Sequence, residues 1–221
     1  MSASPQDSDA IASARAARSL AVFEAVALVL LSLATVGTAW CSFQAAAWSG
    51  VSQRFTNLSA ASSRTAAANQ LQFQQLALLD VMMFSHYINA RAGSNEALAR
   101  FYSERFRGEA KTAFEAWMAT LPFENANAPA HPFVTNFYQP RLLAEARQAE
   151  TDSQRSWQQA GEAGRTSRSY VLITVLLASA LFCGGTASKF EVLWIRRSVL
   201  LLGLAAFGFA AQRLVLLPVQ L

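Results

Sequence analysis

The chain has 221 residues, of which 53% are apolar and only 14% are charged, whereas an average soluble domain is about 25% charged. Two cysteines and two histidines exclude a disulfide-stapled scaffold and argue against a zinc site built from histidine. The net charge of +4 is spread along the chain among acidic residues, so the basic surface of a nucleic-acid-binding protein is missing. We therefore expect a membrane protein with no nucleic-acid partner.

Three stretches of the sequence are long and apolar enough to cross a bilayer, which takes about 20 apolar residues as a helix. No charge occurs between Glu24 and Arg54, none occurs between Arg168 and Lys189, and Arg213 is the one charge from residue 198 to the end. We predict transmembrane helices at 20–42, 169–188 and 198–218. Residues 1–19 then form an N-terminal tail, and residues 189–197 form a short loop.

The first apolar stretch could instead be a cleaved signal peptide. The small residues Gly37-Thr38-Ala39 resemble a cleavage site. The polar tail in front of the stretch and the length of the apolar run favour a permanent span.

The basic residues of the short segments predict the orientation of the chain. Arg15 and Arg18 lie in the tail, and Lys189, Arg196 and Arg197 lie in or beside the short loop. Positively charged short segments stay in the cytoplasm, so the tail and the loop are expected there. Residues 43–168 would then lie outside, in the periplasm of a bacterial inner-membrane protein, although two arginines beside the second span, at 165 and 168, oppose this orientation.

The first span is expected to continue as one helix to about residue 90. No proline occurs from Thr38 to Arg91, and good helix formers such as alanine, glutamine and leucine are frequent. A row of residues at steps of three and four predicts a coiled-coil seam with polar members. Its members are Phe55, Leu58, Ser62, Ala66, Asn69, Phe73, Leu76, Asp80, Met83 and Tyr87.

The rest of residues 43–168 is also expected to be helical. Gly93 suits a left-handed helix end, and Ser94 or Asn95 suits the next helix start. A second helix should run to about Thr120, and a third should run from Arg141 into the second span, while the prolines of 122–132 forbid a long helix between them. The predicted fold class is all-α, with three transmembrane helices and an extramembrane three-helix bundle.

Several aromatic and proline motifs of this chain resemble those of a group of uncharacterised bacterial three-span helical membrane proteins. The motifs are Ala34-Thr-Val-x-Thr-Ala-Trp40, Phe43-Gln44, Trp48-Ser-Gly50, Phe101-Tyr102-x-x-Arg105-Phe106, Ala116-Trp117, Pro122-Phe123 and Ala128-Pro129-x-x-Pro132-Phe133. The resemblance implies a three-span topology. It implies no activity, cofactor or site residue.

Glu24 is one of two charged residues inside the predicted spans. It lies near the cytoplasmic end of the first span, where it is expected at headgroup level, paired with Lys189, Arg196 or Arg197. The alternative is that it marks an ion path, because intramembrane acids often do so.

Arg213 is the second such charge, and it is expected to extend to the outer headgroups. A polar cavity shared with Gln212 and Gln44 is the alternative. Cys41 and Cys183 lie at different depths of the predicted spans, so we expect two free, buried thiols.

No group of residues in the sequence suggests catalysis or metal binding. His86 and His131 are isolated, and Asp80 interrupts an apolar run, so each is expected to be a satisfied polar residue of a helical bundle. No nucleotide-binding, hydrolase or metalloprotease motif occurs. We therefore predict that the protein is not an enzyme and holds no cofactor.

Two features could mediate contacts between proteins. The proline–aromatic segment, residues 122–140, carries the candidate interaction residues Phe123, Phe133, Phe137 and Tyr138. Their rings either pack on the protein itself, which we favour, or face a partner. Small residues in the second and third spans permit close helix packing, either within the chain or between copies; they are Ala180, Gly184, Ser188, Gly203 and Gly208.

Taken together, these features predict a structural or interaction protein. The external domain would dock another copy or a membrane or periplasmic protein, and the spans would contact the lipid bilayer. A subunit of an oligomeric channel or transporter is the alternative, since three spans with so few charges could line a path only as several copies.

Overall fold

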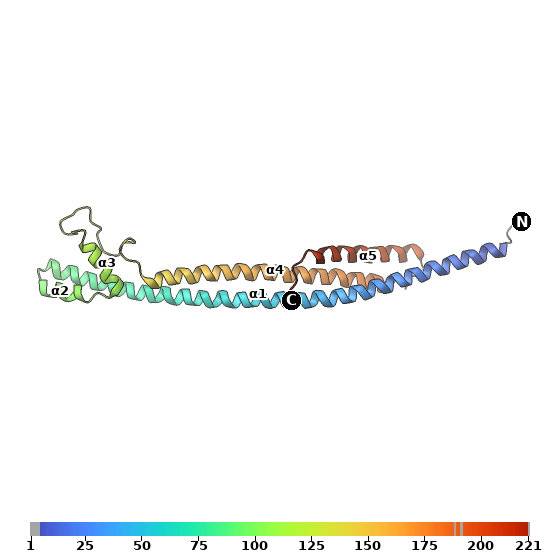
Figure 1. Ribbon diagram of the computed structural model, residues 1–221, viewed down its shortest axis with the longest axis horizontal. Coiled ribbons are helices and arrows are strands. Elements are labelled where there is room, and N and C mark those ends of the chain that lie inside the picture. The colour runs from blue at the N-terminus through green and yellow to red at the C-terminus, as the bar shows by residue number, and fades with distance from the viewer. Residues whose placement is uncertain (1–4, 188, 191, 221) are drawn as a thin grey trace. The chain divides into compact units, whose positions relative to one another are not determined.

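A computed structural model describes the backbone of residues 5–187, 189–190 and 192–220 and the side chains from residue 21 onward. Five helices form the regular structure of these residues (Figure 1): α1 (Pro5–Ala92), α2 (Glu96–Glu104), α3 (Gly108–Met118), α4 (Arg141–Ala187) and α5 (Leu193–Val215). No strand occurs within the described ranges, so the all-α prediction is confirmed. α1, α4 and α5 are each long and apolar enough to cross a membrane.

Prolines mark the starts of α1 and α4 and the end of α5. Pro5 begins α1, Pro140 directly precedes α4, and Pro218 follows α5. Proline fits the first turn of a helix but breaks its interior. The next proline after Pro5 is Pro122, so nothing of this kind interrupts the 88 residues of α1.

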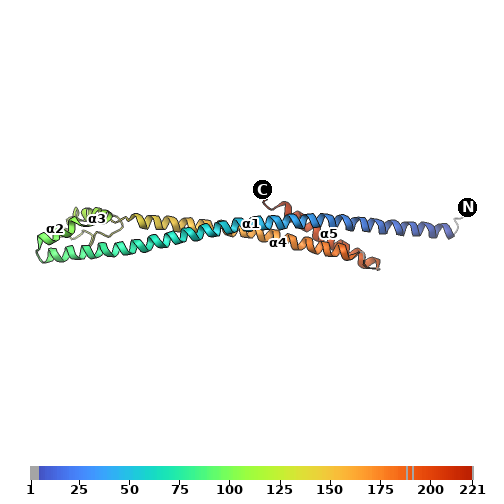
Figure 2. The same cartoon turned by 90° about the horizontal axis from the view of Figure 1, so that it is seen from below.

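The chain divides into two compact units, and the first contains residues 1–55 and 159–221. In this unit α5 lies alongside the C-terminal part of α4 in both cartoon views (Figures 1 and 2). The buried residues of its main core are mostly small or aliphatic: Ala34, Cys41, Ala45, Tyr170, Ile173, Leu177 and Ala210. A Cβ added at Gly203 of α5 would lie 3.0 Å from the Cβ of Cys183, so glycine permits the close approach of these helices.

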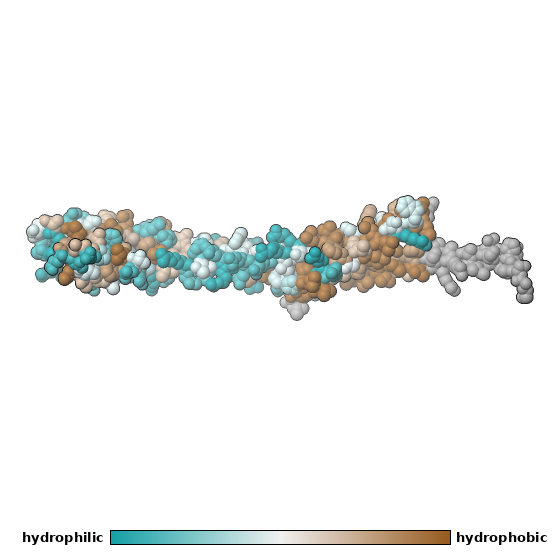
Figure 3. Space-filling model, turned by 90° about the horizontal axis from the view of Figure 1, so that it is seen from above, coloured by the Kyte–Doolittle hydropathy of each residue, from teal (hydrophilic) through white to brown (hydrophobic). Residues whose placement is uncertain are grey.

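The outer surface of unit 1 is apolar. Leucine, valine and phenylalanine side chains that are more than half exposed occur on all three helices; examples are Leu28, Val36, Leu172, Phe182, Leu201 and Leu202. Figure 3 shows hydrophobic residues gathered over α5 and the neighbouring helices. Exposed apolar surface of this extent marks contact with lipid or protein, which agrees with three helices able to cross a membrane.

The second unit, residues 56–158, is held by a seam between α1 and α4. On α1 the buried and half-buried residues follow steps of three and four, as predicted. One position differs: Leu58 is exposed and Ser59 is buried in its place. The hydroxyl of Ser153 on α4 donates to the carbonyl of Ser59, and the two hydroxyls are 3.1 Å apart, so a small polar pair fits where leucine would not.

The predicted three-helix bundle is not what unit 2 contains. Its expected second helix is two short helices, α2 and α3, which are separated at Arg105–Arg107, and residues 119–140 are irregular. The left-handed residue after α1 is Ser94, with φ 55°, rather than the predicted Gly93. Asn95, one of the two expected caps, precedes α2, and its side chain accepts a hydrogen bond from the amide of Leu98.

Candidate functional site

An ion pair with a buried carboxylate holds three separate segments of unit 2 together. Asp80 of α1 is 3% exposed. Its carboxylate accepts hydrogen bonds from Nε and Nη2 of Arg107 at 2.8 and 2.7 Å and from the hydroxyl of Tyr138 at 2.7 Å. Such paired, charge-assisted bonds are the strong kind. We call Asp80, Arg107 and Tyr138 the Asp80 cluster.

Arg107 reaches Asp80 because it lies between two helices. Its backbone is extended, with φ −72° and ψ 158°, directly before the first residue of α3. Burial lowers the pKa of Arg107, but the hydrogen bond and the charge of Asp80 outweigh this effect and leave the pKa raised. The guanidinium therefore stays charged throughout the accessible pH range.

Tyr138 contributes the third group of the cluster from the end of the proline–aromatic segment. Burial raises the pKa of Tyr138, and the hydrogen bond to Asp80 raises it further. The phenol is therefore protonated at neutral pH and donates its proton to the carboxylate.

Glu109 extends the Asp80 cluster to the start of α4. Its carboxylate lies 3.8 Å from Nη1 of Arg107 and accepts a hydrogen bond of 3.0 Å from the backbone amide of Arg141. An acidic group at a helix start satisfies a free amide and favours the helix dipole. The network thus connects α1, α3, the proline–aromatic segment and α4.

The chemistry of the cluster is that of a structural clamp. Both oxygens of Asp80 already accept hydrogen bonds from Arg107, and the expectation that Asp80 is a satisfied polar residue is confirmed. In the described part of the chain, no group of three or more metal-ligating side chains converges. His86 stacks on Tyr102 with ring centroids 5.3 Å apart, and His131 lies 6.1 Å from Phe133.

Three of the four predicted interaction residues pack on the protein itself. The ring of Phe133 meets those of Phe84 and Tyr138 edge-on, at 5.7 and 5.3 Å. Phe137 packs against the aromatic cluster around Phe114, and Tyr138 belongs to the Asp80 cluster. These contacts agree with packing, the interpretation favoured from the sequence.

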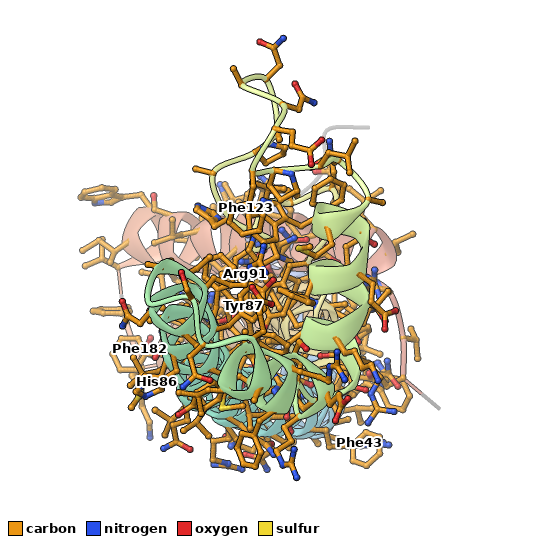
Figure 4. All side chains as sticks on the ribbon, turned by 90° about the vertical axis from the view of Figure 1, so that its left-hand side faces the viewer. Phe43, His86, Tyr87, Arg91, Phe123 and Phe182 are labelled. Carbon is orange, nitrogen blue, oxygen red and sulfur yellow. The ribbon has the colours of Figure 1, made fainter. Side chains whose placement is uncertain are left out.

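Phe123 is the exception, since 53% of it is exposed. It contacts the ring of Trp117 edge-on at 5.8 Å, and the guanidinium of Arg91 lies 5.3 Å from its centroid. Figure 4 shows Arg91 between Phe123 and Tyr87. Of the four rings, Phe123 is the exposed one, whereas the other three are half-buried.

Glu24 has one of the three partners expected for it. Its carboxylate lies 3.9 Å from a guanidinium nitrogen of Arg196. The guanidinium groups of Arg196 and Arg197 each lie 5.8 Å from the ring of Phe23. The acid is therefore partly neutralised by the start of α5.

The polar cavity considered for Arg213 is not formed with Gln44. Gln44 is fully buried and exchanges two hydrogen bonds of 2.9 Å with the backbone of Gln220, whereas Arg213 lies over the ring of Phe209. Cys41 and Cys183 are both free, as predicted, although Cys183 is half-buried rather than buried. Ser188, one of the small residues expected to permit close helix packing, lies outside the described residues.

Sequence reasoning missed an exposed stripe on α1 that consists of three apolar residues and one glutamine. Leu71, Gln75, Leu78 and Met82 are spaced by four, three and four residues, and all four are exposed. At 100° per residue they lie on the side of α1 opposite the seam that faces α4. The spacing of these residues is present in the sequence, but the seam that faces α4 has the same spacing over more residues. We call these four residues the α1 outer stripe.

Comparison of the chain with protein-family models, with curated proteins and with solved structures finds no match.

Proposed function

We propose that this protein is a non-enzymatic membrane protein that associates with a second copy of itself through the α1 outer stripe. The observation that carries the proposal is the exposure of this stripe, in which Leu78 is 62% exposed. Its spacing of four, three and four is that of the contact positions of a coiled coil. A helix with apolar residues on two opposite sides needs a partner for each side, and α4 covers only one.

The low charge of the part of α1 that carries the outer stripe favours an identical partner. Between Arg64 and Arg91 the one charged residue is Asp80, which is buried in the Asp80 cluster. Two copies in one membrane share the same orientation, so a two-fold pair would place each residue of α1 beside its own counterpart. Like charges would repel in that arrangement, whereas leucine, methionine and glutamine do not. Gln75 would fix the register, as single polar residues do in coiled coils.

The proposed location is a bacterial inner membrane, with the N-terminus in the cytoplasm and residues 43–168 in the periplasm. The basic residues Lys189, Arg196 and Arg197 near the start of α5 support this orientation by the positive-inside rule. A reporter that is active only outside the cytoplasm should work when it is fused after Gly93 and should fail when it is fused after Lys189. Equal activity at both positions would contradict the orientation.

Disulfide cross-linking in intact membranes tests the self-association. In a chain with Cys41→Ala and Cys183→Ala, Leu78→Cys should form a covalent dimer on mild oxidation, because the two stripes place residue 78 beside its counterpart. Gln154→Cys, an exposed position on α4, is the matched control and should remain monomeric. Equal cross-linking at both positions, or none at Leu78→Cys, would refute a contact through the stripe.

A further inference from the structure

A groove with hydrocarbon walls lies between α4 and α5 in unit 1. Its volume is about 470 Å³, within the roughly 300–1,000 Å³ of ordinary ligand pockets. Its walls include Leu172, Ile173 and Leu176 of α4, Phe209 of α5, and Leu217, which lies two residues after the end of α5. We call it the α4–α5 groove. Walls of this kind suit an aliphatic chain.

A positive charge lies in the wall of this apolar groove. Arg213 lines it beside Ser169, whose hydroxyl donates within its own helix to the carbonyl of Arg165 at 3.1 Å. Arg213 contacts the ring of Phe209. Among the described residues, no carboxylate lies within ion-pair distance of Arg213. Within the described ranges, the groove thus presents a cation with no carboxylate at ion-pair distance.

Two further arginines continue the same wall. Arg165 precedes Ser169 by four residues, and Arg168 precedes Leu172 by four, so each lies one helical turn beyond a groove residue on the same side of α4. Both are exposed. Glu162, about one turn further along α4, is the acid nearest to them in the sequence. Arg165, Arg168 and Arg213 together with Glu162 give this end of the groove a net charge of +2.

Aromatic residues indicate that this end lies at headgroup depth. The hydroxyl of Tyr170 and the indole nitrogen of Trp48 each donate to the carbonyl of Pro218 at 3.0 Å. The C-terminal end of α5 therefore lies level with Tyr170, next to Ser169. Tryptophan gathers where a membrane meets water, and Trp48 is only half-buried. Arg165 and Arg168 also directly precede the uncharged run of α4, so the arginines lie near lipid phosphates and the walls extend toward the acyl chains.

We infer that the α4–α5 groove binds an anionic phospholipid, with one acyl chain between the helices and the phosphate on Arg213 and Arg165. A helix from a second copy would not neutralise the positive charge of the groove. In the described part of the predicted spans the one acid is Glu24, which lies beside Arg196, so such a helix would bring no counter-ion. The inference requires the proposed crossing of a bilayer but not the proposed self-association.

Native mass spectrometry of the full chain in mild detergent tests this binding. The chain is titrated with phosphatidylglycerol or with phosphatidylcholine that carries the same acyl chains. We expect one tightly bound phosphatidylglycerol per chain and a preference over phosphatidylcholine of about tenfold, since a charge-assisted bond contributes about that factor. Arg213→Gln and Arg165→Gln should each remove most of the preference, and Arg213→Lys should keep it. Arg54→Gln, an exposed cation away from the groove, is the matched control.

Two competitors separate the lipid from free phosphate. Lysophosphatidylglycerol, with one chain, should displace the bound lipid, and glycerol phosphate should not, because it has nothing to place between the helices. Three results would overturn the inference: no preference in the wild-type chain, an equal loss with Arg54→Gln, or displacement by glycerol phosphate. A wild-type chain absent from the membrane fraction would instead contradict the proposed location. The cross-linking of Leu78→Cys tests self-association alone, so its result does not depend on whether the lipid binds.

Discussion

Asp80 of α1 and Arg107 before α3 lie 27 positions apart in sequence and form a two-pronged ion pair at 2.8 and 2.7 Å. The Asp80 side chain is buried and the Arg107 side chain is about one-third exposed. Because Tyr138 donates to the same carboxylate, one side chain of α1 fixes both the break between α2 and α3 and the end of the proline–aromatic segment.

Removing the charge of Asp80 should destabilise unit 2. Asp80→Asn leaves Arg107 without its counter-ion and removes a strong acceptor, and we expect a loss of about 2–3 kcal/mol in the free energy of unfolding. Asp152→Asn is the control, because Asp152 and Arg155 form an exposed pair on α4, for which a loss of about 0.5 kcal/mol is expected. Denaturation followed by circular dichroism measures both. Equal losses would show that the Asp80 cluster contributes no more than a surface pair.

Stability should decline at high pH through Tyr138. Burial and the hydrogen bond to Asp80 raise its pKa above the usual value of about 10. The stabilisation from the phenol proton is then fully present below about pH 10 and is lost as the pH rises through the folded-state pKa. Tyr138→Phe should therefore be less stable than wild type at pH 8, and the difference should narrow above pH 10. A difference that stays constant from pH 8 to pH 11.5 would contradict this assignment.

The four aromatic residues of the proline–aromatic segment should differ in their effect on folding. Phe133→Ala removes edge contacts with Phe84 and Tyr138. We expect it to lower the free energy of unfolding by about 2–4 kcal/mol. This is less than for a fully buried phenylalanine, because Phe133 is half-buried. Phe123→Ala, at an exposed position, should cost about 1 kcal/mol or less. Thermal denaturation compares the two. A larger effect at Phe123 would mean that the segment packs differently.

Two glycines of α5 should respond differently to alanine. A Cβ at Gly203 would meet the Cβ of Cys183 at 3.0 Å, whereas a Cβ at Gly208 has no neighbour within 4 Å. Gly203→Ala should therefore weaken the packing of α5 by about 1–3 kcal/mol, and Gly208→Ala should be neutral or slightly stabilising. Thermal unfolding in detergent, with aggregation as the readout, distinguishes the two variants by their midpoint temperatures. Identical midpoints would argue that α5 does not pack closely at Gly203.

Local sequence features predicted the long helices and the packing that depends on them. Apolar runs and the spacing of prolines predicted the three long helices, because both act over short distances along the chain. Two starts differ from the prediction: α1 already begins at Pro5, inside the predicted tail, and α5 begins at Leu193, inside the predicted loop 189–197. The seam of α1 followed from its periodicity, with one error at Leu58. A hydrophobicity pattern favours leucine there, but the close approach of α4 selects Ser59 and its bond to Ser153.

Contacts between distant residues accounted for the features that could not be predicted. The break between α2 and α3 falls in Arg105–Arg107, which contains no proline. The one residue beside it that disfavours a helix is Gly108. Arg107 leaves the helical conformation while it binds Asp80 in another segment, and helix propensity contains no information on that contact. The two partners of Asp80 could not be predicted either, since Arg107 and Tyr138 lie 27 and 58 positions away in the sequence.

The molar mass of the purified protein tests the central claim of self-association most directly. Light scattering in detergent, with the detergent contribution subtracted, should give about twice the chain mass of 23.9 kDa, since two-fold pairs are the commonest assemblies. Leu78→Glu should give one chain mass, because it places two like charges together, and Leu98→Glu on α2 should remain dimeric. A monomeric wild-type protein, or a dimer that Leu78→Glu leaves intact, would contradict association through the α1 outer stripe.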